Sequence, residues 1–180
     1  MEYCILWMGE KELEEFIMLL KIILEGVGLG VILILGCAVG IRNGAIGMLH
    51  LYRQDVQERC IKMGLITKEQ ISKKAKRMKF CMIMIYLFYL LFAVYVINGA
   101  RGFVSAALQC FAILSILNLM DRFLIDELWV GHTKAWTIQG TEDLKPYINK
   151  QDRVKKWLVG TLGFVLISLM IAGIMSAFLA

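Results

Sequence analysis

The last 24 residues of the chain, Trp157 to Ala180, carry no charged side chain and are mostly apolar. As an α-helix this segment is about 36 Å long, which is enough to cross a hydrocarbon core of about 30 Å with some tilt. A soluble protein has little use for such a run at its surface. The segment therefore predicts a transmembrane helix.

Three other apolar stretches have comparable lengths. Hydrophobic residues make up 59% of the chain, above the ~45–50% that is usual in soluble domains. A segment in lipid must satisfy its own backbone hydrogen bonds, so each stretch is expected to be a helix. We predict an all-α fold, an integral membrane four-helix bundle that forms a single membrane domain over residues 1–180. The predicted spans are about 22–41, 80–97, 102–120 and 157–180.

Basic residues are distributed unevenly among the segments that connect these spans. Residues 53–79 carry nine Lys or Arg and residues 121–156 carry seven, whereas the short 98–101 connection holds only Arg101. The first 21 residues hold five Glu against two Lys. The positive-inside rule then predicts a multi-pass protein of the cell membrane, with both long loops in the cytosol and both termini outside.

A basic cluster lies just before the second span and contributes to the net charge of +5. Each basic residue near a membrane surface gains about 1 kcal/mol from an anionic leaflet. Nucleic-acid binding would need interleaved aromatic residues or a known module, and the sequence shows neither. We therefore expect the bilayer, with anionic lipid headgroups, to be the partner of this loop, and we expect no nucleic acid. The cluster consists of Lys73, Lys74, Lys76, Arg77 and Lys79.

Helical patterns also occur outside the spans. Residues 2–21 are amphipathic and acidic, which predicts an interfacial helix on the outer surface with Trp7 at the headgroups. Residues 54–63 predict a short helix that ends at Gly64, a natural left-handed C-terminal cap. Residues 67–70 match a capping box that starts a second helix, and this helix leads directly into the second span. Both cytosolic loops are thus expected to be helical in part.

Polar residues recur along the third span and beyond its apolar part. They are Ser115, Asn118, Arg122 and Asp126. Their spacings of three, four and four residues place them on one helix face, and the helical pattern continues through Val130. Such side chains are costly in lipid unless they face protein or water, so we expect the stripe to point inward, with Arg122 and Asp126 paired. Two interpretations stay open: a span that merely ends at the headgroups, or a polar vestibule that is entered from the cytosol.

The vestibule interpretation supplies a set of candidate ligand-binding residues. They are Asn118, Asp121, Arg122, Asp126, Glu127, His132 and Lys134. Asp121 and Glu127 lie about 240° apart around one helix, and the i,i+3 or i,i+4 spacing of helical metal ligands is missing. We therefore predict no metal site, and no cofactor is indicated.

Two classes of function are compatible with these features. The first is a non-catalytic protein: a small transporter-like, ligand-binding or accessory subunit with a polar cytosolic vestibule on the third span. The alternative is a membrane-embedded enzyme in which Asp121, Asp126, Glu127 and His132 act on a lipid or isoprenoid substrate. The string from Asn118 to Asp121, followed by Asp126, resembles in part the Asn/Asp-rich box of intramembrane prenyltransferases, whose further acidic repeat is missing here.

Glycines recur every four residues toward the end of the first span, at Gly36, Gly40 and Gly44. Small residues at this spacing allow helix backbones to approach closely. We expect this face to pack against another span or against its own copy in a homo-oligomer.

Overall fold

The computed structural model describes residues 9–179, which form helices joined by turns and contain no β-strand. The elements in chain order are α2 (Glu10–Ile41), η1 (Ala45–Leu51), α3 (Gln54–Lys62), α4 (Lys68–Leu91), η2 (Phe92–Ile97), α5 (Phe103–Met120), η3 (Asp121–Val130), η4 (Lys134–Trp136), η5 (Glu142–Leu144) and α6 (Lys150–Leu179). The π-helical segments η2 and η3 continue α4 and α5 without a break. The predicted continuation of the third span to Val130 is therefore confirmed.

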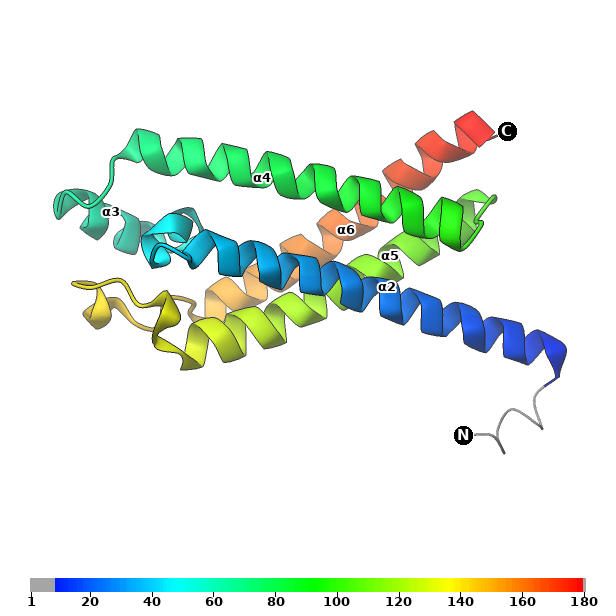
Figure 1. Ribbon diagram of the computed structural model, residues 1–180, viewed down its shortest axis with the longest axis horizontal. Helices are drawn as coiled ribbons and strands as arrows, with labels where there is room; N and C mark the ends of the chain where they lie inside the picture. Colours follow the sequence, from blue (N-terminus) through cyan, green and yellow to red (C-terminus); the bar gives the residue numbers. More distant parts are fainter. Residues whose placement is uncertain (1–8, 180) are drawn as a thin grey trace.

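Four helices in the described part of the chain are long and apolar enough to cross a membrane: α2, α4 with η2, α5 with η3, and α6. They run lengthwise through the molecule (Figure 1). One end carries the 98–101 connection, the start of α2 and the end of α6, and we call it the hairpin end. The other end carries η1, α3, η4 and η5, and we call it the loop end. The predicted all-α architecture is confirmed, and the described part of each predicted span lies almost wholly within one of these helices.

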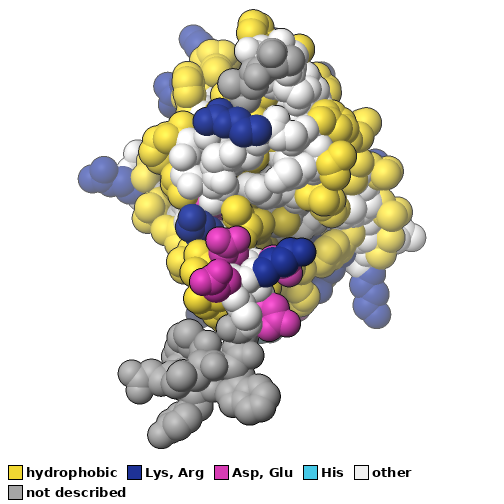
Figure 2. Space-filling view, turned by 90° about the vertical axis from the view of Figure 1, so that its right-hand side faces the viewer, with side chains coloured by type: hydrophobic (Ala, Val, Ile, Leu, Met, Phe, Trp, Pro, Cys, Tyr) yellow, Lys and Arg dark blue, Asp and Glu magenta, His cyan; other side chains and the backbone are white. Residues whose placement is uncertain are grey.

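The start of α2 differs from the prediction. Residues 10–21 do not form a separate interfacial helix, because α2 runs unbroken from Glu10 to Ile41. The strong helix formers Glu, Leu, Lys and Met fill this stretch, and it lacks the Pro or Gly that would interrupt the helix. Residues 2–8 of the predicted segment lie outside the described residues. The beginning of α2 projects past the hairpin end (Figure 1), and acidic side chains gather there while hydrophobic ones surround the bundle (Figure 2).

α5 is the central helix of the bundle, because both α2 and α6 pack along it. Two glycines bring α2 close. A Cβ atom at Gly26 would lie 2.6 Å from Cβ of Ile116, and one at Gly30 would overlap the sulfur of Met120. The missing side chains therefore allow the two backbones to approach.

The three glycines predicted to form a packing face have different surroundings. A Cβ atom at Gly36 would make ordinary contact with Met82 of α4, whereas one at Gly40 would overlap the sulfur of Met48 of η1. Gly44 follows the end of α2 with a φ of 95°, and a Cβ there would meet nothing within 4 Å. Gly44 is thus a turn residue rather than part of a helix-packing face, since its backbone conformation is one that side chains disfavour.

The connection between α3 and α4 has the predicted capping chemistry. Gly64 has a left-handed φ of 72°. The N–H of Gln70 donates to Thr67 Oγ1 at 3.3 Å, and the N–H of Thr67 donates to Gln70 Oε1 at 3.1 Å. This reciprocal pair is the predicted capping box. Asn149 and Asp152 make a similar reciprocal pair at the start of α6, with distances of 2.7 and 3.3 Å.

The loop end has an apolar core of its own. Val56 and Cys60 of α3 are buried together with Trp136, Ile138 and Tyr147 from the long connection between η3 and α6. Burial of these side chains ties the connection to α3. It thereby brings residues 136–148 over the ends of α2 and α5, where they close one side of a cavity.

Candidate ligand-binding cavity

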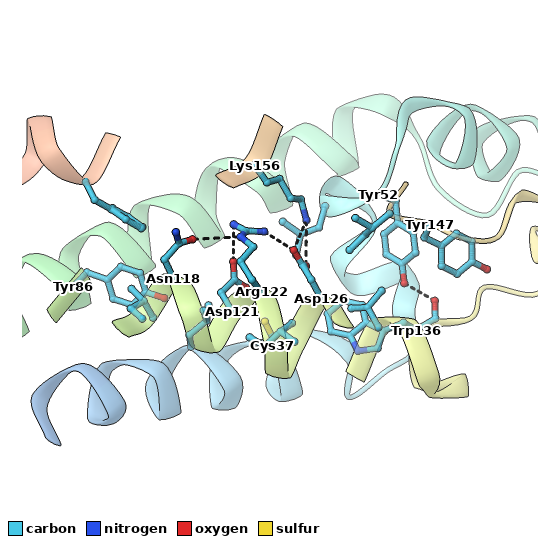
Figure 3. Close-up of a pocket in the computed structure, with 17 residues that line it drawn as sticks. Cys37, Tyr52, Tyr86, Asn118, Asp121, Arg122, Asp126, Trp136, Tyr147 and Lys156 are labelled. Carbon is cyan, nitrogen blue, oxygen red and sulfur yellow. Dashed lines mark hydrogen bonds and ion pairs between the residues drawn. The ribbon is translucent and has the colours of Figure 1, made fainter. Parts of the chain in front are cut away.

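A cavity of about 350 Å³ lies inside the loop end, where side chains of α2, α4, α5, η3 and α6 converge (Figure 3). Its volume falls within the ~300–1,000 Å³ that is usual for small-molecule sites. The apolar part of the wall comes from all the long helices and from the loop-end connections. The full lining is Leu33, Cys37, Leu51, Tyr52, Tyr86, Leu117, Asn118, Asp121, Arg122, Ile125, Asp126, Val130, Trp136, Tyr147, Ile148, Lys156 and Phe164.

A charged cluster centred on Arg122 forms the polar part of the wall. The Arg122 guanidinium donates through Nε to Asn118 Oδ1 at 3.3 Å and through Nη1 to Asp126, and its Nη2 lies 2.9 Å from Asp121 Oδ2. Its side chain is only 14% exposed. The predicted pairing of Arg122 with Asp126 is confirmed. Three partners hold the guanidinium in one orientation, because its N–H groups form a fixed fork.

A second cation reaches the cluster from α6. Lys156 Nζ lies 3.2 and 3.1 Å from the two carboxylate oxygens of Asp126. The Asp126 side chain is 10% exposed and is therefore held between Arg122 on its own helix and Lys156 on a neighbouring one. The cluster thus links η3, which continues α5, to the start of α6 (Figure 3).

Glu127, the next residue of η3, also reaches α6, where it pairs with Arg153. On an α-helix, adjacent side chains such as Asp126 and Glu127 would point well apart. A π-helix has more residues per turn than an α-helix, so adjacent side chains of η3 point less far apart. Both carboxylates find partners on α6, where Arg153 and Lys156 are one helical turn apart. The Glu127 pair lies outside the cavity wall, with both side chains about 40% exposed.

The seven predicted ligand-binding residues divide into two groups. Asn118, Asp121, Arg122 and Asp126 line the cavity, whereas Glu127, His132 and Lys134 are not part of its wall. The His132 ring Nδ1 lies 2.7 Å from the carbonyl oxygen of Glu127, and His132 and Lys134 are exposed. The structure therefore does not bring His132 beside the carboxylates of Asp121 and Asp126.

Aromatic side chains form the wall opposite the helices. Tyr52 donates its hydroxyl to the carbonyl oxygen of Trp136 at 2.5 Å, and its ring meets that of Tyr147 with centroids 5.1 Å apart. Burial raises the pKa of Tyr52, so its hydroxyl stays a neutral donor. Sequence reasoning missed Tyr52, Tyr147 and Lys156. No local pattern marks them, because their partners are 84, 95 and 30 residues away in the chain, respectively.

A second hollow adjoins the cavity, and we call it the mouth. The lining residues that the two share are Leu51, Tyr52, Arg122, Tyr147, Ile148 and Lys156. The mouth adds Arg53, Asp152, Lys155, Val159 and Gly160. Its additional side chains are mostly charged, in contrast to the apolar interior.

Within residues 9–179, no three His, Cys, Asp or Glu side chains are grouped so that they could hold an ion. Comparisons with protein-family models, with curated proteins and with solved structures find no match to this chain.

Proposed function

We propose that this is an integral membrane protein that binds an amphipathic molecule in the loop-end cavity, with the loop end in the cytosol. The orientation rests on the excess of Lys and Arg in the two long loops, which are both at this end. The observation that carries the binding role is the cavity itself: an apolar interior next to a charged cluster, with a charged opening to the surface.

The charged cluster favours binding over catalysis. The carboxylates of Asp121 and Asp126 both lie against the Arg122 guanidinium, and Asp126 also contacts Lys156. A general base must be able to approach the proton that it removes, and here both carboxylates are engaged in ion pairs. Glu127 and His132, which the enzymatic alternative requires, lie outside the cavity. We therefore place the non-catalytic function first.

The interior of the bundle favours binding over permeation. Beyond the cavity, toward the hairpin end, Leu29, Leu90 and Ile113 belong to a packed apolar cluster and are almost fully buried. Close packing of this kind leaves no path wide enough for a solute. This packing supports a binding or accessory role rather than a channel through a single chain.

Photolabelling with a diazirine-bearing fatty alcohol, applied to the full chain in nanodiscs, tests the proposal. We expect adducts on the cavity residues Leu33 and Phe164 that disappear when excess unlabelled alcohol competes. Adducts on the exposed, lipid-facing side chains Phe80 and Phe88 serve as the internal control, because bulk lipid contact does not saturate.

A blocking variant sharpens the test. Leu51 lines both the cavity and the mouth and is 52% exposed, so Leu51→Trp should fill the passage without disturbing the core and should abolish the saturable labelling. The matched control is Leu128→Trp, at a position that is 55% exposed and outside the cavity wall. Labelling that is unsaturable at every site, or that Leu51→Trp leaves intact, would contradict the proposal.

A further inference from the structure

Glu25 of α2 is a buried acidic residue at the hairpin end, far from the cavity wall. It is 7% exposed, and its Oε2 atom accepts a hydrogen bond from Nδ2 of Asn98 at 2.9 Å. Asn98 follows η2 directly and begins the connection that leads into α5. The pair therefore joins α2 to the 98–101 connection.

The second oxygen of each side chain in this pair lacks a partner. Glu25 Oε1 and Asn98 Oδ1 are both shielded from solvent, and neither has a hydrogen-bond partner in the part of the chain that the structure describes. Both atoms are acceptors while Glu25 is ionised, so they cannot satisfy each other. An ionised carboxylate is costly to bury when one oxygen has no partner and no cation lies beside it. A donor is therefore missing from the pair.

The ionisable groups around Glu25 do not supply this donor. On α2, Lys21 is one turn away, but it is exposed and its ammonium group lies more than 4.0 Å from the carboxylate, as does the exposed Arg101 of the connection. On α4, the Tyr89 hydroxyl donates to the backbone carbonyl oxygen of Glu25 instead. Helix α5 carries no charged side chain, and its one ionisable residue is Cys110, a weak donor.

The two free oxygens favour a proton over a metal ion as the missing group. Ca²⁺ takes about 6–8 oxygen ligands and Mg²⁺ requires a nearly octahedral set, whereas this pair offers two oxygens. A proton needs only one oxygen to carry it and one to accept from it. Bound to Glu25 Oε1, it would make that atom a donor to Asn98 Oδ1 and would satisfy both oxygens at once.

We propose that the hairpin end binds a proton between Glu25 and Asn98, which then form a closed acid–amide pair with two hydrogen bonds. The Asn98 amide donates to Glu25 Oε2, and the protonated Oε1 donates to the Asn98 carbonyl oxygen. Release of the proton to solvent breaks the second bond and leaves a buried negative charge. The proton thus fastens α2 to the 98–101 connection. This site is separate from the cavity and does not depend on the proposed function.

Infrared spectroscopy of the full chain tests the protonation, because a carboxylic acid has a carbonyl-stretch band that a carboxylate lacks. The protein is kept at pH 7.5 in a maltoside detergent, which has no carbonyl group of its own. We expect the acid band in the spectrum of the wild type minus that of Glu25→Gln. The control is Glu15→Gln, an exposed position on the same helix, and its difference spectrum should lack the band.

Two further variants test the partner of Glu25. Asn98→Ala removes the donor to Oε2 and should shift the acid band to higher frequency, since a carbonyl group that accepts no hydrogen bond has a stiffer bond. Lys21→Gln should leave the band unchanged. Glu25→Gln itself should fold normally, as circular dichroism can check, because its amide can both donate to Asn98 and accept from it.

A difference spectrum without the acid band would show that Glu25 is ionised and would overturn the proposal. A band that appears only in the Lys21→Gln background would also overturn it, because Lys21 would then be the partner of an ionised Glu25. A band whose frequency is the same in the wild type and in Asn98→Ala would refute the closed pair.

Discussion

The two ends of the bundle each bury a carboxylate, but in different surroundings. At the loop end Asp126 contacts two cations, Arg122 and Lys156. At the hairpin end Glu25 is 7% exposed and accepts a hydrogen bond from the Asn98 side chain at 2.9 Å. Within residues 9–179, no Lys or Arg nitrogen lies within 4.0 Å of Glu25.

This difference indicates what holds each end together. The ion pairs at the loop end join η3 to α6, so they act as cross-links between two helices. At the hairpin end the polar contacts are neutral, since Asn98 and the Tyr89 hydroxyl, which donates to the Glu25 carbonyl oxygen at 2.8 Å, carry no charge. We therefore expect the close packing of α2 on α5 at Gly26 and Ile116 to contribute more to stability at this end than the polar contacts do. Four measurements test this comparison.

The largest effect is expected at Asp126. Asp126→Asn should lower the free energy of unfolding by about 3 kcal/mol, because it leaves Lys156 without a charged partner and Arg122 with Asp121 alone in a mostly buried site. Titration with SDS in mixed micelles, followed by circular dichroism, measures the change. Glu127→Gln is the control, since its exposed pair with Arg153 should contribute less than about 1 kcal/mol. Equal effects would refute the cross-link.

The next effect is expected at Gly26. Gly26→Ala should cost about 2 kcal/mol, because the new Cβ would meet Ile116 at 2.6 Å and force α2 and α5 apart. The control is Gly163→Ala on α6, where a Cβ meets nothing within 4 Å and the substitution should be neutral or stabilising by up to about 1 kcal/mol. The same SDS titration compares the two variants.

A smaller effect is expected at Glu25. Glu25→Gln keeps a polar side chain of the same shape beside Asn98 and should change the free energy of unfolding by less than about 1 kcal/mol, because no ion pair is lost. A decrease in the free energy of unfolding as large as that of Asp126→Asn would contradict the difference between the two ends. It would show that a charged partner acts on Glu25 in the assembled protein.

The smallest effect concerns His50 of η1, where burial and the nearby Lys79 and Lys74 lower the pKa of the imidazole. The unfolded chain then binds a proton more readily than the folded one, so this group makes stability fall as the pH drops from above 6.5 through the unfolded pKa. Thermal unfolding between pH 7.5 and 5.5 should show this loss, and His50→Gln should reduce it. An identical pH profile for the two proteins would contradict the assignment.

Local patterns predicted much of the helical framework. The four spans, the capping box at Thr67, the turn at Gly64 and the Arg122–Asp126 pair all depend on residues within a few positions of one another. The predictions that were wrong also relied on local patterns, which do not show how a helix continues or where it ends. The amphipathic pattern at the start of α2 could not reveal that the helix continues straight, and the spacing of Gly36 to Gly44 could not reveal where the helix ends.

The length and apolar character of a segment are local properties, so the sequence alone was enough to predict four helices that are long and apolar enough to cross a membrane. It also determined which residues share the polar face of the third span, because helical periodicity is a local property. Three features appear only once the helices are packed: Lys156 joins Asp126, Tyr52 and Trp136 close the cavity, and Gly26 and Gly30, rather than Gly44, admit a neighbouring helix. These contacts join segments far apart in the chain, and they depend on how whole helices pack.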